Sequence, residues 1–160
     1  MIVGSAGELK ESLGAGRRVL GLDVGSKTVG LALSDAAHIV ATPYKTLARG
    51  KFAKLAGELR QIINEMEVGG LVIGLPLYMD GYEGPRCRAT RDFAANLEKA
   101  LGEQGEDVPI LFHDERLSTA AVERMLIDEA DMTRKRRAQV IDKAAAAYIL
   151  QGALDIMANR

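Results

Sequence analysis

The sequence has little of several residue types that build particular kinds of site. Cys87 is the single cysteine and tryptophan is absent, so an internal disulfide and a cysteine-based zinc site are both excluded. This cysteine usage is typical of a reducing, cytoplasmic setting. Aromatic residues make up only 4% of the chain, which leaves little surface on which single-stranded bases could stack. Since no apolar run of about 18 residues and no secretory signal pattern is present, we expect neither a membrane span nor export.

An excess of charge of one sign is also missing, since 21 Lys and Arg residues stand against 22 Asp and Glu residues. The net charge of -1 excludes a uniformly basic nucleic-acid binder and restricts any such contact to local patches. The 160 residues, 48% of them hydrophobic, are enough for one domain with a substantial core. Residues 1–16 are glycine-rich and weakly patterned, so we interpret them as a flexible N-terminal extension of a domain spanning 17–160.

The order of the hydrophobic patterns predicts an α/β fold. Three β-rich runs, expected to form an antiparallel meander, occupy residues 17–25, 28–35 and 39–47. Helical spacing then alternates with short apolar strands, with helices predicted at 51–66, 86–101, 118–129 and 139–158 and strands at 69–76 and 108–113. Alternation of this kind indicates parallel crossovers. Three antiparallel strands followed by two parallel ones, flanked by helices, predict the five-stranded mixed sheet of the ribonuclease H-like fold.

The segment GLDVGSKT, residues 21–28, matches a phosphate-binding P-loop except that Ser26 replaces the second glycine. A P-loop needs a helix directly after its lysine, so that main-chain amides face the phosphate. The residues after Lys27 alternate like a strand instead, and the carboxylate of Asp23 would repel phosphate at the same place. We therefore reject a P-loop and look for another role for Asp23.

Asp23 lies in a run that is apolar enough to be a central strand. Period-two alternation places it on the same face as Val19 and Gly21. A buried carboxylate is costly without a partner or a metal ion, and Lys27 is the only nearby cation in the sequence. A second interpretation stays open, in which Asp23 caps the turn that follows it.

Three more acidic residues are candidates for a site. Asp114 and Glu115 follow the fifth predicted strand, where open α/β sheets place their ligand sites. The alternative is that they pair with Arg116 in solvent or face the N-terminus of the next helix. Asp142 lies on the apolar stripe of the last predicted helix. The alternative for Asp142 is a surface ion pair with Lys143. Neighbours in sequence do not face each other on a helix, so we favour a functional role for Asp142.

If Asp23, Asp142 and either Asp114 or Glu115 converge, their carboxylates could hold Mg²⁺ or Mn²⁺, hard cations that take oxygen ligands. Two such ions activate water and stabilise the leaving oxygen in phosphodiester hydrolysis, so the set predicts a metal-dependent nuclease. A basic run such as 134–137 is also typical of a solvated loop. We nevertheless expect basic residues beside the carboxylates to bind phosphates of a nucleic acid, and these are Lys27, Arg86, Arg88, Arg134, Lys135, Arg136 and Arg137.

Four segments occur in a familiar order: LGLDVGSKTVGLALSD, VIGLPLYMDGYEG followed by FAANL, DERLST, and IDKAAAAYIL. Together they resemble the YqgF/RuvX family, the RuvC-like branch of the ribonuclease H-like superfamily, over about residues 17–158. The resemblance implies a divalent-metal-dependent nuclease that either processes the 5′ end of pre-16S ribosomal RNA or resolves Holliday junctions. It also implies the roles of single residues, with Asp23, Glu115 and Asp142 as the acidic site, Asp114 as an additional metal ligand, Arg116 as a phosphate contact and 74–76 as the loop that shapes the cleft.

Other functions compete with this interpretation. Residues 23–28 also fit the D-x-G-[ST]-x-[ST] turn of actin-like and sugar-kinase ATPases, but those enzymes close two such domains around ATP and this chain has room for one. A non-catalytic nucleic-acid-binding module would keep the same fold and basic patches. The sequence leaves open RNA or branched DNA, and a monomer or a homodimer. By resemblance we favour pre-16S ribosomal RNA, with a ribosomal subunit precursor as partner.

Overall fold

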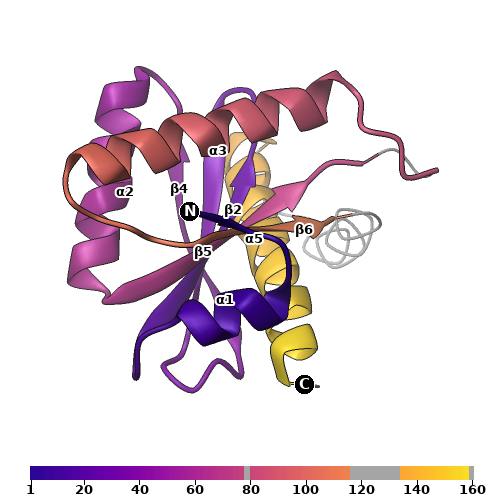
Figure 1. The fold of residues 1–160 in the computed structure, drawn as a ribbon. Coiled ribbons are helices and arrows are strands. Elements are labelled where there is room, and N and C mark those ends of the chain that lie inside the picture. The colour runs from indigo at the N-terminus through magenta and orange to yellow at the C-terminus, as the bar shows by residue number, and fades with distance from the viewer. Residues whose placement is uncertain (78–79, 116–133, 159–160) are drawn as a thin grey trace.

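The structure is a computed structural model of the 160-residue chain. It describes residues 1–77, 80–115 and 134–158, with side chains from 141 onward in the last range. Figure 1 shows a central sheet between two layers of helices. Its elements in chain order are β1 (Ile2–Val3), α1 (Ala6–Ser12), β2 (Arg18–Val24), β3 (Thr28–Ser34), β4 (Ala41–Ala48), α2 (Phe52–Glu65), β5 (Val68–Leu75), α3 (Pro85–Glu103), β6 (Ile110–Asp114) and α5 (Arg134–Ala158).

The sheet has the strand order β1-β6-β5-β2-β3-β4. β2, β3 and β4 pair antiparallel in sequence order, whereas β5 pairs parallel with β2 and β6 pairs parallel with β5. Short turns join the antiparallel strands, and the longer connections needed for parallel pairing contain α2 and α3. The predicted meander followed by two parallel strands is confirmed.

Residues 1–16 contain two ordered elements, which corrects the expected five-stranded sheet to six strands. β1 pairs parallel with β6, and α1 buries Leu9 completely. Gly70 on β5 makes room for this leucine, since a Cβ at Gly70 would stand 2.8 Å from a Leu9 methyl carbon. Ser5 caps α1 by accepting a hydrogen bond from the Glu8 amide at 3.2 Å, and glycine-rich composition hides this helix start. The domain boundary after residue 16 stays a prediction.

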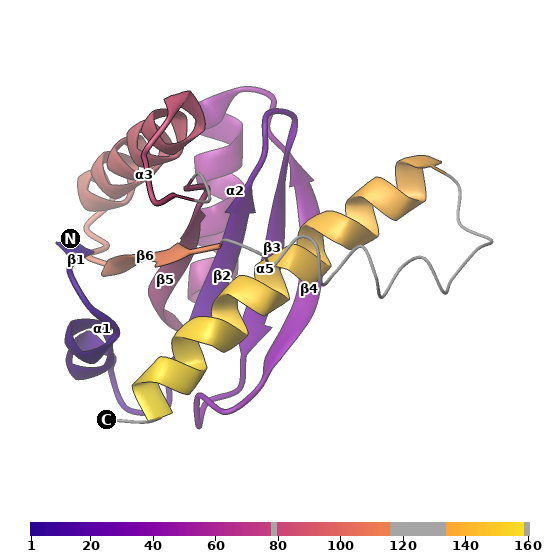
Figure 2. The same cartoon turned by 90° about the vertical axis from the view of Figure 1, so that its right-hand side faces the viewer.

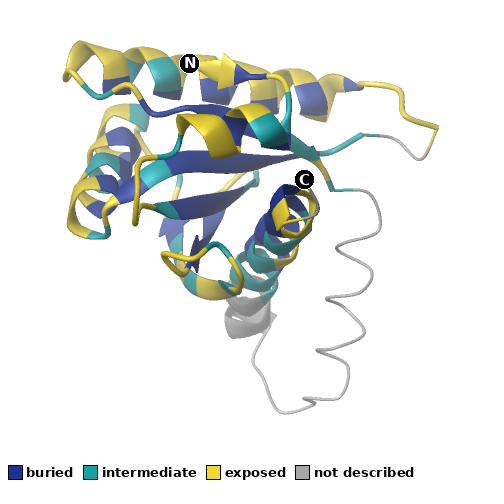
Figure 3. Ribbon diagram, turned by 60° about the horizontal axis from the view of Figure 1, so that its bottom comes forward, coloured by how far each residue is buried: buried dark blue, intermediate teal, exposed yellow. Residues whose placement is uncertain are grey.

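Each face of the sheet has its own core. α2 and α3 cover one face, and α1 and α5 cover the other (Figure 2). Figure 3 shows buried strands between helices whose outer sides are exposed. Within β2, Leu20 and Leu22 belong to the core under α2 and α3, whereas Val19 belongs to the core under α5. Strand alternation therefore directs the odd-numbered side chains of β2 toward α5.

The last helix starts earlier than its apolar pattern predicts. α5 begins at Arg134, so the basic run 134–137 lies inside the helix and not in a loop before it. Arg and Lys are good helix formers, which explains why a charged stretch continues the helix. The predicted helix at 118–129 lies outside the described residues. Among the helices that the structure describes, none has the length and apolar character needed to cross a bilayer.

Candidate active site

Asp23 lies near the carboxyl end of β2, on the face that α5 covers. Val19 on this face packs in the core under α5. Gly21 faces the helix directly, since a Cβ at Gly21 would stand 2.7 Å from the Cβ of Leu150. The predicted shared face of these β2 residues is therefore confirmed. α5 passes close over β2, and the half-buried Asp23 lies at the end of this contact.

Asp142 approaches Asp23 because α5 also packs tightly on β3. Gly30 is the β3 partner of Asp23, and it lies so close to the main-chain carbonyl of Asp142 that a Cβ has no room. Figure 2 shows α5 crossing β2, β3 and β4. At the start of β3, Thr28 donates a hydrogen bond from Oγ1 to Asp142 Oδ2 at 2.5 Å. A glycine and a hydroxyl on one strand thus position both the backbone and the carboxylate of Asp142.

Glu115 follows β6 directly and lies over the neighbouring strand. Its amide donates a hydrogen bond to the carbonyl of Leu75 at 3.3 Å. Gly74 leaves space for the carboxylate, because a Cβ at Gly74 would stand 2.5 Å from Glu115 Oε2. Gly74 also faces Ile149 of α5, so Glu115 shares the α5 face of the sheet with Asp23.

The charges of Glu115 and Asp142 act on Asp23. The pKa of Asp23 is raised from 3.8 to about 7, first by burial and then by the negative charges of Glu115 and Asp142. Burial also raises the pKa of Glu115. The Arg86 guanidinium lowers both pKa values without offsetting the increase. Asp23 is therefore a buried carboxyl group whose acidic neighbours Arg86 only partly offsets, a condition that is common where carboxyl groups have a functional role.

The donor chemistry of this site fits a hard divalent cation. Carboxylates are the ligands that Mg²⁺ and Mn²⁺ prefer, and a cation would offset the excess negative charge around Asp23. In the described part of the chain, no three Asp, Glu, His or Cys side chains are grouped in a way that could already hold a metal ion. Asp114 is exposed at the end of β6. The predicted ligand set of Asp23, Glu115, Asp142 and Asp114 therefore stays a prediction.

The predicted phosphate-binding residues do not all lie in the same kind of place relative to the carboxylates. Arg86, in the first turn of α3, lies within electrostatic reach of Asp23 and Glu115. Lys27 and Arg88 are exposed. The remaining members are not described: Arg116 lies outside the described residues, and the side chains of Arg134, Lys135, Arg136 and Arg137 are not described within α5. The contacts of all these residues with nucleic acid stay predictions.

Some residues that support the site carry no distinctive signal in the sequence. Thr28 and Gly30 look like ordinary strand residues, and their partner Asp142 is 114 residues away from Thr28. A glycine inside a strand does indicate a close approach of another backbone, and that was the available signal for Gly30.

Cys87 donates a hydrogen bond from Sγ to the carbonyl of Pro76 at 3.1 Å. This bond ties the first turn of α3 to the end of β5.

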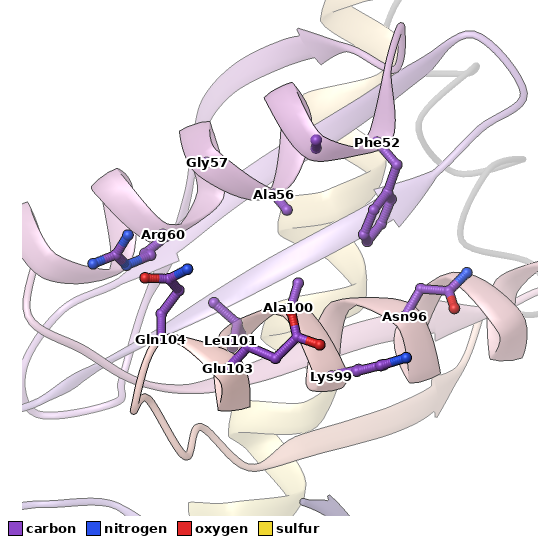
Figure 4. Close-up of a pocket in the computed structure, with 11 residues that line it drawn as sticks. Phe52, Ala56, Gly57, Arg60, Asn96, Lys99, Ala100, Leu101, Glu103 and Gln104 are labelled. Atoms are coloured by element: carbon purple, nitrogen blue, oxygen red, sulfur yellow. The ribbon is translucent and has the colours of Figure 1, made fainter.

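A cavity of about 460 Å³ lies between α2 and α3. Figure 4 shows the small lining residues Ala56 and Gly57 on α2 and Ala100 on α3, with the longer side chains of Arg60 and Lys99 on the same helices. These helices cover the sheet face opposite α5. The cavity is therefore separate from the carboxylates and is not the place where we expect chemistry.

Known proteins resemble this chain in sequence and in fold. A family model described as "RuvX: Holliday junction resolvase" matches residues 17–156. The "Putative pre-16S rRNA nuclease" of Paramagnetospirillum magneticum is 57% identical over 148 residues, which cover 92% of each chain. A protein of the same name from Ruegeria pomeroyi is 50% identical over 159 residues, 99% of each chain. The second match therefore includes nearly all of residues 1–16.

Solved structures share the fold at low sequence identity. T. thermophilus RuvC, in complex with a Holliday junction substrate, has a TM-score of 0.52 at 15% identity, over 86% of this chain and 93% of that one. The yeast mitochondrial Holliday junction resolvase Ydc2 has a TM-score of 0.57 at 14% identity, over 94% and 82% of the two chains. Both likenesses establish the ribonuclease H-like α/β fold. Given the extent of the family match and the identity to its relatives, the chain belongs to the RuvX family.

Proposed function

We propose that this protein is a divalent-metal-dependent nuclease that processes the 5′ end of pre-16S ribosomal RNA. The observation that carries the proposal is the convergence of Asp23, Glu115 and Asp142, from β2, the end of β6 and α5, on one face of the sheet. Relatives that are 50% and 57% identical are named for this activity. The setting implied by this function is the cytoplasm, with a precursor of the small ribosomal subunit as partner.

In this proposal Asp23, Glu115 and Asp142 hold Mg²⁺ or Mn²⁺. When bound, such ions supply the activation of water and the stabilisation of the leaving oxygen in phosphodiester hydrolysis. Asp23, whose carboxyl pKa is about 7, would have to be ionised to hold such an ion, because a ligating carboxylate must be deprotonated. Arg86 binds a substrate phosphate that would otherwise face only carboxylates.

We expect Thr28→Val to lower the rate of metal-dependent cleavage by about 10–100-fold, the usual effect of removing a hydrogen bond to a metal-binding side chain. Valine keeps the shape of threonine but cannot donate to Asp142 Oδ2, so the carboxylate loses the bond that orients it. Thr28→Ser keeps the hydroxyl and should retain most of the activity. Cleavage rates at saturating metal measure the effect, and a Thr28→Val protein as fast as the parent would contradict it.

A second candidate is cleavage of branched DNA, which the description of the matching family model favours. A symmetric four-way junction presents two equivalent strands, so this activity calls for a homodimer with two sites. Processing of an RNA end can proceed in a monomer. A non-catalytic module would differ from both in binding nucleic acid without cutting it.

The proposed function is tested with a labelled 16S precursor RNA that has a 5′ extension and, in parallel, a four-way DNA junction. Each is incubated with the purified protein and Mn²⁺, Mg²⁺ or EDTA. We expect the RNA to be shortened to one defined 5′ end in the presence of metal and to stay intact in EDTA. Cleavage of the junction alone would make branched DNA the substrate. Binding of either nucleic acid without cleavage in both metals would reject a nuclease.

A further inference from the structure

The residue that follows β4 holds the turn between β2 and β3. This turn connects the strand of Asp23 to Thr28, and the Gly25 amide closes it by donating to the Thr28 carbonyl at 2.9 Å. Arg49 contacts the turn twice. Its amide donates to the Lys27 carbonyl at 2.9 Å, and its guanidinium Nη1 donates to the Gly25 carbonyl at 2.9 Å. The turn is therefore held by hydrogen bonds from Arg49 as well as by its own Gly25–Thr28 hydrogen bond.

The guanidinium of Arg49 is also fixed from the other side. Its Cζ lies 5.3 Å from the ring centroid of Phe93 on α3, within the range of a cation–π contact. Phe93 is only 2% exposed, and it packs edge-on against Phe52 of α2 with ring centroids 5.8 Å apart. Arg49 thus connects the β2–β3 turn to a well-packed core.

We propose that Arg49 is a positioning residue for the site, acting through the β2–β3 turn and Thr28 on the carboxylate of Asp142. This inference rests on the proposed function. The contacts run from Arg49 Nη1 to the Gly25 carbonyl, through the turn to Thr28, and from Thr28 Oγ1 to Asp142 Oδ2. Arg49 itself is bonded to main-chain carbonyls and acts through other residues, so its role is not catalytic.

Loss of the guanidinium would act on Asp142 by removing the side-chain bond to the Gly25 carbonyl, which leaves the turn held only by the main-chain bonds of Gly25 and Arg49. Glycine gives the turn little conformational restraint of its own, so Thr28 would shift relative to α5. A hydrogen bond of 2.5 Å weakens steeply once its distance or angle departs from good geometry. Ligating side chains also need their supporting hydrogen bonds to keep a productive orientation. A misplaced Asp142 would therefore weaken both metal binding and the chemical step.

The test compares Arg49→Met, Thr28→Val and the double variant. Methionine keeps an apolar stem over Phe93 but loses the charge and the donor to Gly25. Lys54→Met is the control, because Lys54 is an exposed lysine on α2 and its loss removes the same charge. Arg49→Lys keeps a donor that can reach the turn and should recover part of any loss. The readouts are the dissociation constant for Mn²⁺, kcat and KM on the precursor RNA, and Tm.

We expect Arg49→Met to weaken Mn²⁺ binding and to lower kcat, each by about 5–20-fold, with a smaller change in KM. The double variant should be no worse than Thr28→Val alone, because residues that act through one set of contacts are not additive. Lys54→Met should match the parent. Fold changes that multiply in the double variant would overturn the proposal. A lowered Tm with parental Mn²⁺ affinity and kcat would do so as well, because it would reduce Arg49 to a structural role.

The same measurements separate this inference from the proposed function. If the parent binds Mn²⁺ but cuts neither RNA nor the DNA junction, the proposed function fails. The Mn²⁺ affinities of Arg49→Met, Thr28→Val and the double variant then still decide whether Arg49 acts through Thr28. If the parent binds no Mn²⁺, both proposals are overturned.

Discussion

Replacing Asp142 with asparagine is expected to lower the rate of metal-dependent RNA cleavage on the order of a thousandfold. Asparagine keeps the size of the side chain and an acceptor for Thr28 Oγ1, but it removes one negative charge from the site that Asp23 and Glu115 share. Loss of a charge that holds a catalytic cation costs several kcal/mol of transition-state stabilisation, and about 1.4 kcal/mol corresponds to a factor of ten. Single-turnover cleavage at saturating Mn²⁺ measures the effect.

Asp155→Asn is the matched control for this experiment. Asp155 is exposed on the same helix and accepts a hydrogen bond from Gln151 Nε2 at 2.9 Å, which asparagine can also accept. We expect this variant to stay within about twofold of the parent, as is usual for surface substitutions. Cleavage by Asp142→Asn at the parental rate would remove Asp142 from the site. An equal loss in both variants would indicate damage to α5 instead of lost chemistry.

Replacing Asp23 with asparagine is expected to stabilise the metal-free protein above pH 7 while it abolishes cleavage. The pKa of Asp23 is raised from 3.8 to about 7, so the folded protein binds a proton more tightly at this site than the unfolded chain does. Between pH 3.8 and about pH 7 the unfolded chain binds fewer protons at this carboxyl group than the folded protein does. The free energy of unfolding of the parent therefore falls as pH rises through this range. Above pH 7 the full destabilisation is present, about 2–4 kcal/mol at roughly 1.4 kcal/mol per pKa unit.

Thermal unfolding in EDTA at pH 4 and pH 8 measures this prediction. At pH 4 the two proteins should have similar Tm values, whereas at pH 8 Asp23→Asn should unfold roughly 5–10 °C higher than the parent. The Tm of Asp23→Asn should also fall from pH 4 to pH 8, but by less than that of the parent, because burial also raises the pKa of Glu115. Saturating Mn²⁺ at pH 8 should raise the Tm of the parent more than that of Asp23→Asn. An Asp23→Asn protein that is less stable than the parent at pH 8 would contradict the electrostatic interpretation.

The faces of Asp23 and Asp142 could be predicted because each depends only on local geometry. Alternation in a strand and the periodicity of a helix direct a side chain to one face whatever the rest of the molecule does. The position after a strand end pointed to Asp114 and Glu115 together, because in an open α/β sheet this edge is where sites form, and the family resemblance selected Glu115. Residues 1–16 were harder to interpret, because a two-residue strand and a seven-residue helix are too short to show periodicity.

The sequence by itself determined the type and order of the described elements from β2 onward, the antiparallel and parallel pairing of β2 to β6, and the likeness to one family. Only the tertiary structure decided that β1 joins the edge of β6, that Thr28 bonds Asp142, and that Arg49 holds the turn beside them. Periodicity is a property of neighbouring residues, and it therefore predicts which way a side chain points. A hydrogen bond across 114 residues exists only once α5 has packed on β3, and no local pattern specifies that contact.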